Sequence, residues 1–234
     1  IGSGGFANIE AIIGGAGDDT FAFANMAIFN GTITGGPGSD TLNYAAYLTP
    51  VSVDLSSRSA MNMSSGAAGR YSSIENITGG RVNDILTGGA GANILDGGPG
   101  NDTLSGGAGD DTYKFWAGWG LDTVIESAAG GTDTFDFSAL TTDLFFTLGS
   151  VIVTDGLGNM ATHSGQDIER LLGGSRNDTF TFSANGVALA GDLGTIDGGG
   201  GVNTLNYAAY SDAVTVNLTT GAASGTSGVR NIQN

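Results

Sequence analysis

Large apolar residues recur along the chain at short, regular spacings that are not helical. Four consecutive nine-residue units, 79–87, 88–96, 97–105 and 106–114, each begin with Gly-Gly and carry one large apolar residue at position 8, namely Leu86, Leu95, Leu104 and Tyr113. Residues 51–55 (VSVDL) and 214–218 (VTVNL) alternate apolar and polar residues with the period of two that is typical of a half-buried strand. The pattern predicts short strands separated by glycine-rich turns.

The same unit recurs outside the central block, at residues 14–22, 35–43 and 173–181, and in a degenerate form at 198–206. A longer repeat contains these copies: residues 9–15 (IEAIIGG) lead to LNYAAY at 42–47, and residues 168–174 (IERLLGG) lead to LNYAAY at 205–210. We therefore expect three parts: a first flanking β-solenoid repeat (1–78), a central roll (79–137) and a second flanking repeat (138–234) similar to the first.

If each unit forms one turn and one short strand, two units complete a coil. Residues 18 apart then stack at about 4.8 Å, the spacing of neighbouring strands. This arrangement places Asp84 over Asp102 and Asn93 over Asp111. The sequence therefore predicts an all-β fold, a parallel β-roll or β-solenoid with glycine-rich turns.

The turns carry the candidate chemistry. Glycines at positions 1, 2 and 4 permit positive φ and close backbone approach, so that several carbonyl oxygens can point at one place, and an Asp at position 6 adds a charged oxygen. The candidate side-chain ligands are Asp84, Asp102 and Asp111, with Asn93 as a weaker one, and then Asp19, Asp40 and Asp178. The candidate carbonyl ligands belong to Gly80, Gly89, Gly98, Gly100, Gly107 and Gly109.

The charge and composition indicate which ligand these oxygens hold. Asp and Glu number 23 against 7 Lys and Arg, and the formal net charge of −16 repels nucleic acid and anionic lipid but attracts cations. The absence of cysteine excludes thiolate zinc sites, iron–sulfur clusters and disulfides, and the remaining oxygen ligands suit Ca²⁺. No apolar run approaches the roughly 18 to 20 residues that cross a bilayer, so we expect no membrane span.

Calcium binding is expected to be coupled to folding. Two carboxylates stacked at about 4.8 Å repel by roughly 3 to 4 kcal/mol at an effective dielectric near 20. One apolar residue in nine contributes about 1.5 to 3 kcal/mol, whereas ordering the backbone costs about 1 to 2 kcal/mol per residue. A bound cation would supply the missing stabilisation.

The nonapeptide, Gly-Gly-x-Gly-x-Asp-x-apolar-x, resembles the calcium-binding repeat of the repeats-in-toxin (RTX) family, most specifically over residues 79 to about 137. The resemblance implies a right-handed parallel β-roll, type I secretion and folding on calcium outside the cell. Asp122 and Asp133, beyond the regular block, are similar to the widened last turns of RTX blocks and are further candidate ligands. The flanking repeats resemble the long arrays of giant RTX adhesins.

These features predict a calcium-binding structural module of a secreted or surface-displayed bacterial protein. Joined end to end, the chain would read NIQN-IGSGG, close to the internal ENITGG, and so we expect it to be one unit of a tandem array. The candidate partners are calcium ions, neighbouring copies, and a cell-surface or matrix ligand. The alternatives are a non-catalytic RTX carrier domain of a type I secreted enzyme (a protease, lipase or epimerase), and carbohydrate or ice binding by an exposed β face.

An enzyme is not expected. The single histidine, His163, lies beside Ser164 with Asp155 and Asp167 nearby, but no nucleophile elbow or oxyanion motif accompanies it, and we expect it in a surface loop. One histidine also excludes the H-E-x-x-H zinc motif. The carboxylate pairs Asp18-Asp19 and Asp110-Asp111 occupy positions 5 and 6 of a repeat, where a ligand or a solvated turn accounts for them.

Overall fold

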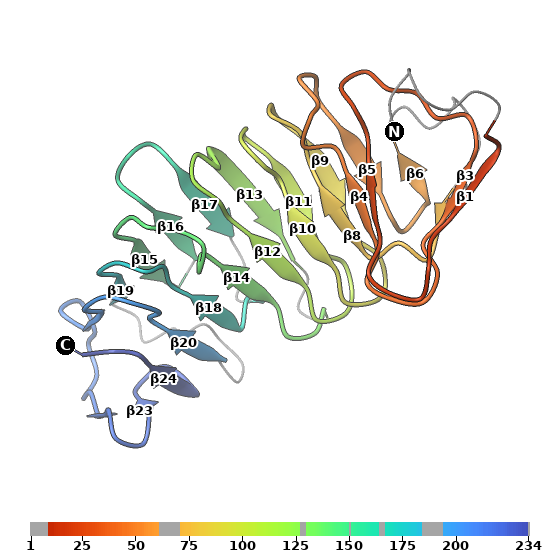
Figure 1. Ribbon diagram of the computed structural model, residues 1–234. Helices are drawn as coiled ribbons and strands as arrows, with labels where there is room; N and C mark the ends of the chain where they lie inside the picture. Colours follow the sequence, from red (N-terminus) through yellow and green to blue (C-terminus); the bar gives the residue numbers. More distant parts are fainter. Residues whose placement is uncertain are drawn as a thin grey trace.

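The computed structural model describes residues 9–60, 71–126, 130–149, 151–163, 167–183 and 194–233. These residues contain strands, turns and bends but no helix. The strands stack one behind another along a single axis, so that the two ends of the chain lie at opposite ends of the stack (Figure 1).

The described strands form two long sheets and two small ones. The nine-stranded sheet contains, in spatial order, β2 (Thr20–Ala22), β4 (Thr41–Asn43), β8 (Asn76–Thr78), β10 (Ile94–Asp96), β12 (Thr112–Lys114), β14 (Thr134–Asp136), β18 (Arg170–Leu172), β20 (Thr195–Asp197) and β24 (Gly228–Arg230). The ten-stranded sheet contains β21 (Thr204–Asn206), β19 (Thr179–Phe182), β15 (Phe145–Leu148), β16 (Ile152–Thr154), β17 (Met160–His163), β13 (Leu121–Ile125), β11 (Thr103–Ser105), β9 (Ile85–Thr87), β5 (Ser52–Asp54) and β6 (Ser59–Ala60). A third sheet contains β1 (Ala11–Ile13), β3 (Thr32–Thr34) and β7 (Tyr71–Ser72), and the hairpin contains β22 (Val216–Asn217) and β23 (Ala222–Ala223).

The central strands pair in parallel with the register that the nonapeptide predicts. In β10, Leu95 lies beside Ile77 of β8 and Tyr113 of β12, each 18 residues away. Beyond the regular block the coil widens, so that Thr103 pairs with Thr123 and Thr112 with Thr134, 20 and 22 residues away. The chain is therefore a parallel β-solenoid, as predicted.

The core is a continuous column inside the coils. The position-8 residues Leu86, Leu95, Leu104 and Tyr113 are fully buried, as expected for one inward side chain per strand. Aromatic rings extend this column between neighbouring coils: Phe115 stacks on Phe137 with ring centroids 4.4 Å apart, and Phe146 stacks on Phe180 at 4.3 Å. Ring stacking thus follows the same axis as the backbone hydrogen bonds.

Four antiparallel pairings among the described strands interrupt the parallel pattern. Strand β16 runs antiparallel to both β15 and β17, and β5–β6 and β22–β23 are antiparallel hairpins. The alternating stretch 51–55 points Val51, Val53 and Leu55 into the core. Its copy at 214–218 exposes Val214, Val216 and Leu218.

The long sheets run across both of the domain boundaries that the sequence predicts. Strand β8 pairs with β10 across the boundary at residue 78, and β14 pairs with β18 across the boundary at residue 137. The three parts, 1–78, 79–137 and 138–234, remain a prediction about repeat organisation.

The prediction that His163 lies in a surface loop is wrong. The residue ends strand β17, is 3% exposed, and its Nδ1 lies 3.1 Å from the carbonyl oxygen of Val124. The alternation of β17 turns its side chain inward, a placement that a lone histidine in the sequence did not indicate. Ser164, beside it, lies outside the described residues.

Within the described ranges, no helix is long and apolar enough to cross a membrane.

Candidate metal centres

The position-6 side chains form hydrogen-bonded ladders along the edges of the solenoid. On one edge, Asp102 Oδ1 accepts a hydrogen bond from the amide of Asp84 at 2.8 Å, and Asp122 Oδ1 accepts one from the amide of Asp102 at 2.9 Å. On the other edge, Asp111 Oδ1 accepts from Asn93 at 2.7 Å, and Asp133 Oδ1 accepts from Asp111 at 2.8 Å. The predicted stacking of residues 84 on 102 and 93 on 111 is confirmed.

In these ladders, one carboxylate oxygen of each acceptor Asp accepts a hydrogen bond from a backbone amide. At four Asp residues of the chain, the other carboxylate oxygen has no hydrogen-bond partner among the described residues. The Oδ2 atoms of Asp40, Asp102, Asp111 and Asp133 are buried without a hydrogen bond from any described residue, and these side chains are at most 1% exposed. Burying a carboxylate oxygen unpaired is costly. A hard cation is the ligand that such oxygens accept most readily. These residues therefore fit a bound Ca²⁺.

The protonation of these carboxyl groups reflects the same burial. Burial raises the pKa of Asp102 and of Asp133 to about 7, and that of Asp122 to about 8. Burial also raises the pKa of Asp111 and of Asp178 to about 6, and it raises that of Asp84. Neighbouring carboxylates add to the shift at each of these residues except Asp84. A cation among them would favour the ionised forms.

The first glycine of a unit is required because the position-6 carboxylate fills the space beside it. A Cβ on Gly97 would lie 2.3 Å from Asp102 Oδ2, and a Cβ on Gly106 would lie 2.2 Å from Asp111 Oδ2. The second glycine serves a different purpose: Gly98 has a φ of 82°, and a Cβ there would lie 2.4 Å from the carbonyl oxygen of Gly80.

Several of the predicted carbonyl ligands point along the axis of the stack toward the next coil. The carbonyl oxygens of Gly80 and Gly89 face Gly98 and Gly107, while those of Gly100 and Gly109 face Gly120 and Gly131. The ligand roles of these glycines, and of Gly98 and Gly107, remain predictions.

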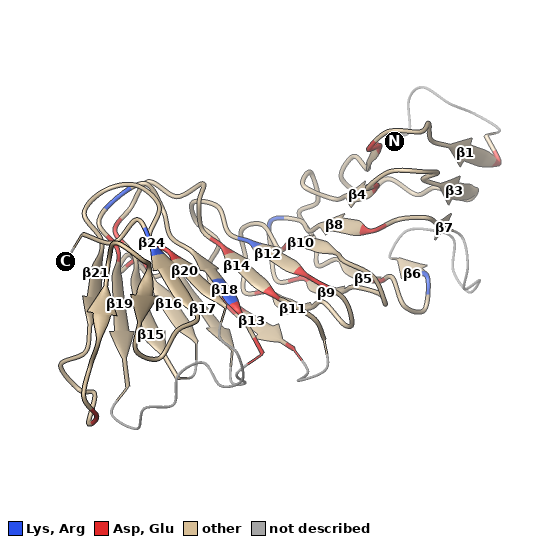
Figure 2. Cartoon of the chain, turned by 90° about the horizontal axis from the view of Figure 1, so that it is seen from below, with Lys and Arg blue, Asp and Glu red and all other residues tan. Residues whose placement is uncertain are grey.

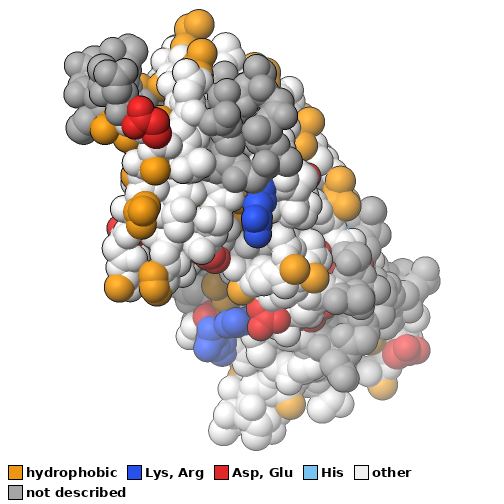
Figure 3. All heavy atoms as spheres, turned by 90° about the vertical axis from the view of Figure 1, so that its right-hand side faces the viewer, with side chains coloured by type: hydrophobic (Ala, Val, Ile, Leu, Met, Phe, Trp, Pro, Cys, Tyr) orange, Lys and Arg blue, Asp and Glu red, His pale blue; other side chains and the backbone are white. Residues whose placement is uncertain are grey.

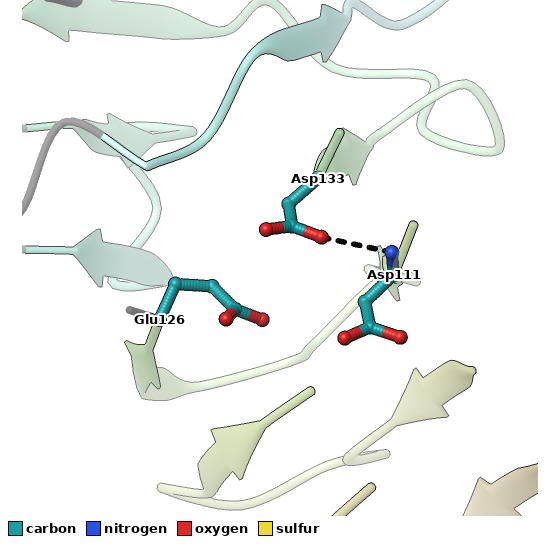
Figure 4. Close-up of side chains that lie close together, drawn as sticks. All are labelled: Asp111, Glu126 and Asp133. Carbon is teal, nitrogen blue, oxygen red and sulfur yellow. Dashed lines mark hydrogen bonds between the residues drawn. The ribbon is translucent and has the colours of Figure 1, made fainter. Parts of the chain in front are cut away.

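Glu126 adds a third carboxylate to the pair formed by Asp111 and Asp133. Ligand oxygens of the three residues all lie within 4.8 Å of one another (Figure 4). Glu126 Oε1 would lie 2.4 Å from a Cβ on Gly106, whereas the equivalent neighbour of Gly79 is the carbonyl oxygen of Gly97 at 2.4 Å. Glu126 therefore stands where regular turns place a backbone carbonyl. The Tyr113 hydroxyl hydrogen-bonds to Glu126 and accepts from the amide of Gly106.

Glu126 is not among the predicted ligands because it belongs to no nonapeptide. It directly follows the five-residue strand β13, where a regular unit would begin with Gly-Gly. An acidic residue at the start of a widened turn is the signal that could have found it.

Glu75, Glu169 and Gln233 were also missed, and they take the ladder position in coils that lack a nonapeptide Asp. Glu75 Oε2 accepts from the amide of Asp40 at 2.9 Å, Glu169 Oε2 accepts from that of Asp133 at 2.7 Å, and Gln233 Oε1 accepts from that of Asn203 at 2.8 Å. Each follows an isoleucine, so the recurring Ile-Glu or Ile-Gln dipeptide was the available signal.

An asparagine side chain at position 6 makes its hydrogen bonds to protein groups and needs no ion. Asn203 Nδ2 donates to the carbonyl oxygens of Gly200 and Asn231, both at 2.9 Å. Asn93 Oδ1 accepts from the amide of Gly89, and its Nδ2 donates to the carbonyl oxygen of Glu75 at 2.6 Å. The prediction that Asn93 supplies a metal ligand is untested, but both ends of its amide have protein partners.

The remaining predicted ligands are buried or partly buried in the same ladders. Both carboxylate oxygens of Asp84 accept backbone hydrogen bonds, from Val51 and Gly80, as do those of Asp178, from Leu144 and Gly174. Asp19 accepts from the amide of Gly15 and is partly exposed. Figure 2 shows acidic residues at strand ends along the solenoid, with few basic residues near them.

A family model, the RTX calcium-binding nonapeptide repeat, matches four copies in residues 5–22, 29–46 and 78–113. The matched ranges contain Asp19, Asp40, Asp84, Asp102 and Asp111. No curated protein matches the chain with significance.

Proposed function

Since the chain is an RTX repeat protein, of a family whose repeats bind calcium, we propose that it is a non-catalytic structural module that folds when calcium enters its turns. The observation that carries the proposal is a set of four buried carboxylate oxygens without a hydrogen-bond partner among the described residues. They are the Oδ2 atoms of Asp40, Asp102 and Asp111 at position 6, and of Asp133 in the widened turn. Calcium would supply the positive charge that these stacked carboxylates lack.

Two features of the chain leave the Oδ2 atoms free to bind calcium. Backbone amides of neighbouring coils hold Oδ1 of each Asp in place, so that Oδ2 faces the turn. Glycine at position 1 leaves room beside that oxygen. Asp111, Glu126 and Asp133 together would hold the most strongly charged site among the described residues.

Export before folding follows from the same electrostatics. With a formal net charge of −16 and stacked acidic turns, the chain repels itself wherever calcium is scarce. It would pass through a type I secretion channel unfolded and fold outside the cell, at the bacterial surface or in the medium. The duplicated flanking segments support a tandem array, as in a giant adhesin, over a compact carrier tail.

The described surroundings of the histidine and of the paired carboxylates support a non-catalytic role. His163 Nε2 is buried and lies 3.9 Å from Asp167, with no hydrogen-bond partner among the described residues. Asp18 and Asp110, the other halves of the carboxylate pairs, accept backbone hydrogen bonds from the next coil. Structural roles thus account for Asp18 and Asp110.

The test is far-UV circular dichroism and calcium titration calorimetry on the chain, with and without a chelator. We expect a mostly coil-like spectrum with a low melting temperature in chelator, a β spectrum in calcium, and several ions bound per chain. A β spectrum that is the same in both conditions, with no heat of calcium binding, would overturn the proposal.

A further inference from the structure

The end of the solenoid formed by β21 and β22 exposes a face that is buried elsewhere in the same chain. Strands β4 and β5 belong to the first copy of the long repeat, and β21 and β22 belong to the second. In the first copy Val51 and Val53 are each 1% exposed, whereas the equivalent Val214 and Val216 are 41% and 40% exposed. Leu218, equivalent to the buried Leu55, is 51% exposed.

The two copies have the same local structure, so the difference lies in what covers them. Tyr44 stacks on Phe23 at 4.7 Å and meets Tyr47 edge-on at 5.2 Å. Tyr207 likewise stacks on Phe182 at 4.1 Å and meets Tyr210 edge-on at 5.5 Å. The antiparallel hairpin β5–β6 has its counterpart in β22–β23. The second copy is therefore already folded into the shape that the first copy presents to its neighbour.

In the first copy, the following coil covers this face with β8 and β9. Leu42 pairs with Ile77 of β8, and Val53 pairs with Leu86 of β9. The described part of the second copy stops short of both pairings: β21 pairs only with β19, and β22 only with β23.

The hydrogen bonds of the backbone amides differ between the two copies in the same way. The amides of Tyr44 and Leu55 donate to the carbonyl oxygens of Thr78 and Thr87, both at 2.8 Å, and the amide of Val51 donates to Asp84 Oδ1 at 2.7 Å. The equivalent amides, those of Tyr207, Leu218 and Val214, donate to no described residue.

We propose that the edge formed by residues 204–218 is a docking surface for one further coil with the chemistry of residues 76–87. That coil needs an isoleucine to lie over Leu205, a leucine at position 8 to cover Val216, and an Asp at position 6 to accept from the amide of Val214. A coil equivalent to residues 76–87, from a further copy of the central roll, provides all three, at Ile77, Leu86 and Asp84. The inference rests on the proposed modular role, because such a coil comes from a neighbouring module of the same kind.

Among the described residues of the opposite end, the exposed hydrophobic side chains are of a different kind. Ile9, Ile13, Met26 and Ile28 are exposed there. Figure 3, in which this end faces the viewer, shows the described hydrophobic side chains at separate places on the face.

The test is to extend the full chain after Gln233 with its own residues 76–105 and to measure amide hydrogen exchange in excess calcium. We expect exchange at Tyr207, Val214 and Leu218 to slow by at least about 10-fold relative to the unextended chain. A matched extension carrying Ile77→Ser and Leu86→Ser should give no protection. A second, carrying Asp84→Ala, should lose protection mainly at Val214.

Equal protection from the native and the Ser-substituted extensions, or none from either, would overturn the docking surface. Calcium titration of the unextended chain reports on the proposed function separately. A chain that binds no calcium yet gains protection from the extension would leave the docking surface standing and remove the calcium role.

Discussion

A single atom, Oδ2 of the position-6 side chain, determines how each turn is held. At Asp102 and Asp111 this oxygen is buried and unpaired, whereas at Asn203 the corresponding nitrogen donates to two carbonyl oxygens. Two arrangements are thus an acid with an oxygen left open to a cation and an amide that supplies its own donors. Asp84 and Asp178 show a third, in which both carboxylate oxygens accept backbone hydrogen bonds. We expect a coil with an unpaired position-6 carboxylate oxygen to depend more on calcium than a coil with Asn at this position.

Asp111→Asn should convert one kind of turn into the other. The amide keeps the acceptor for Asn93, removes one negative charge, and offers a donor to Glu126. We expect calcium affinity at this edge to fall about 10-fold or more, and the melting temperature in chelator to rise by about 2–4 °C, or about 1 kcal/mol.

Calorimetry and thermal unfolding measure both effects. The matched control is Asp110→Asn, which makes the same change in charge at an exposed side chain that accepts from Thr132. If both variants behave alike, net charge and not the buried oxygen controls calcium binding.

The raised pKa values predict how the calcium-free chain responds to pH. Asp102 and Asp133 in the folded state have a pKa of about 7 and Asp122 of about 8, against about 3.9 in an unfolded chain. The folded state thus binds protons more tightly, so its stability is greatest below about pH 4 and is lost as pH rises through 7 and 8.

In chelator, we expect the melting temperature to be at least about 5 °C higher at pH 5 than at pH 8. In excess calcium the order should reverse, because the ion binds the ionised carboxylates. Thermal scans by circular dichroism at both pH values test this, and a calcium-free melting temperature that rises with pH would contradict it.

At the scale of the element, the unit of structure is a turn followed by a strand of about three residues, and the glycines define the turn. Position 1 needs glycine because of the carboxylate beside it, as at Gly97, while position 4 is less uniform. A Cβ on Gly91 would meet no atom within 4 Å, and the φ of this residue is not positive, so sterics do not require glycine there.

Gly97→Ala and Gly91→Ala form a matched pair on this point. The first places a methyl group 2.3 Å from Asp102 Oδ2 and should destabilise the calcium-bound protein by about 1–3 kcal/mol. The second should be neutral or stabilise by up to about 1 kcal/mol, since it only restricts the unfolded chain. Chemical denaturation in calcium measures both, and equal losses would show that turn glycines act through backbone freedom alone.

The sequence predicts the regular elements well because one short rule determines them. The nine-residue period gives the strand positions, the 18-residue register and the buried residues Leu86, Leu95 and Leu104. It does not give β16, whose antiparallel pairing lies in a stretch without a nonapeptide. Nor does it give Glu126 or Glu75, because their carboxylates reach the ladders through wider coils whose path the period does not specify.

At the scale of the whole molecule, each coil contacts only the coils before and after it, so stability is distributed along the axis. Acidic ladder positions dominate from Asp84 to Asp133, whereas the last described coil carries the neutral Asn203 and Gln233. Calcium is therefore expected to stabilise the middle of the solenoid more than the β20–β24 end.

Hydrogen exchange with and without calcium should show this gradient. We expect the gain in protection on adding calcium to be largest in β9 to β14, and smallest in β20 and β24. A uniform gain along the chain would mean that folding is all-or-none and that the local charge of each turn has no separate effect.

The direction of the backbone hydrogen bonds also determines how the module responds to tension. In the long sheets these bonds run from coil to coil, along the axis of the stack. A pull on the two ends would load the backbone hydrogen bonds of one coil at a time and open the coils in sequence. Each regular coil of 18 residues would then release about 60 Å of chain, so the module would act as an extensible, calcium-tightened spring.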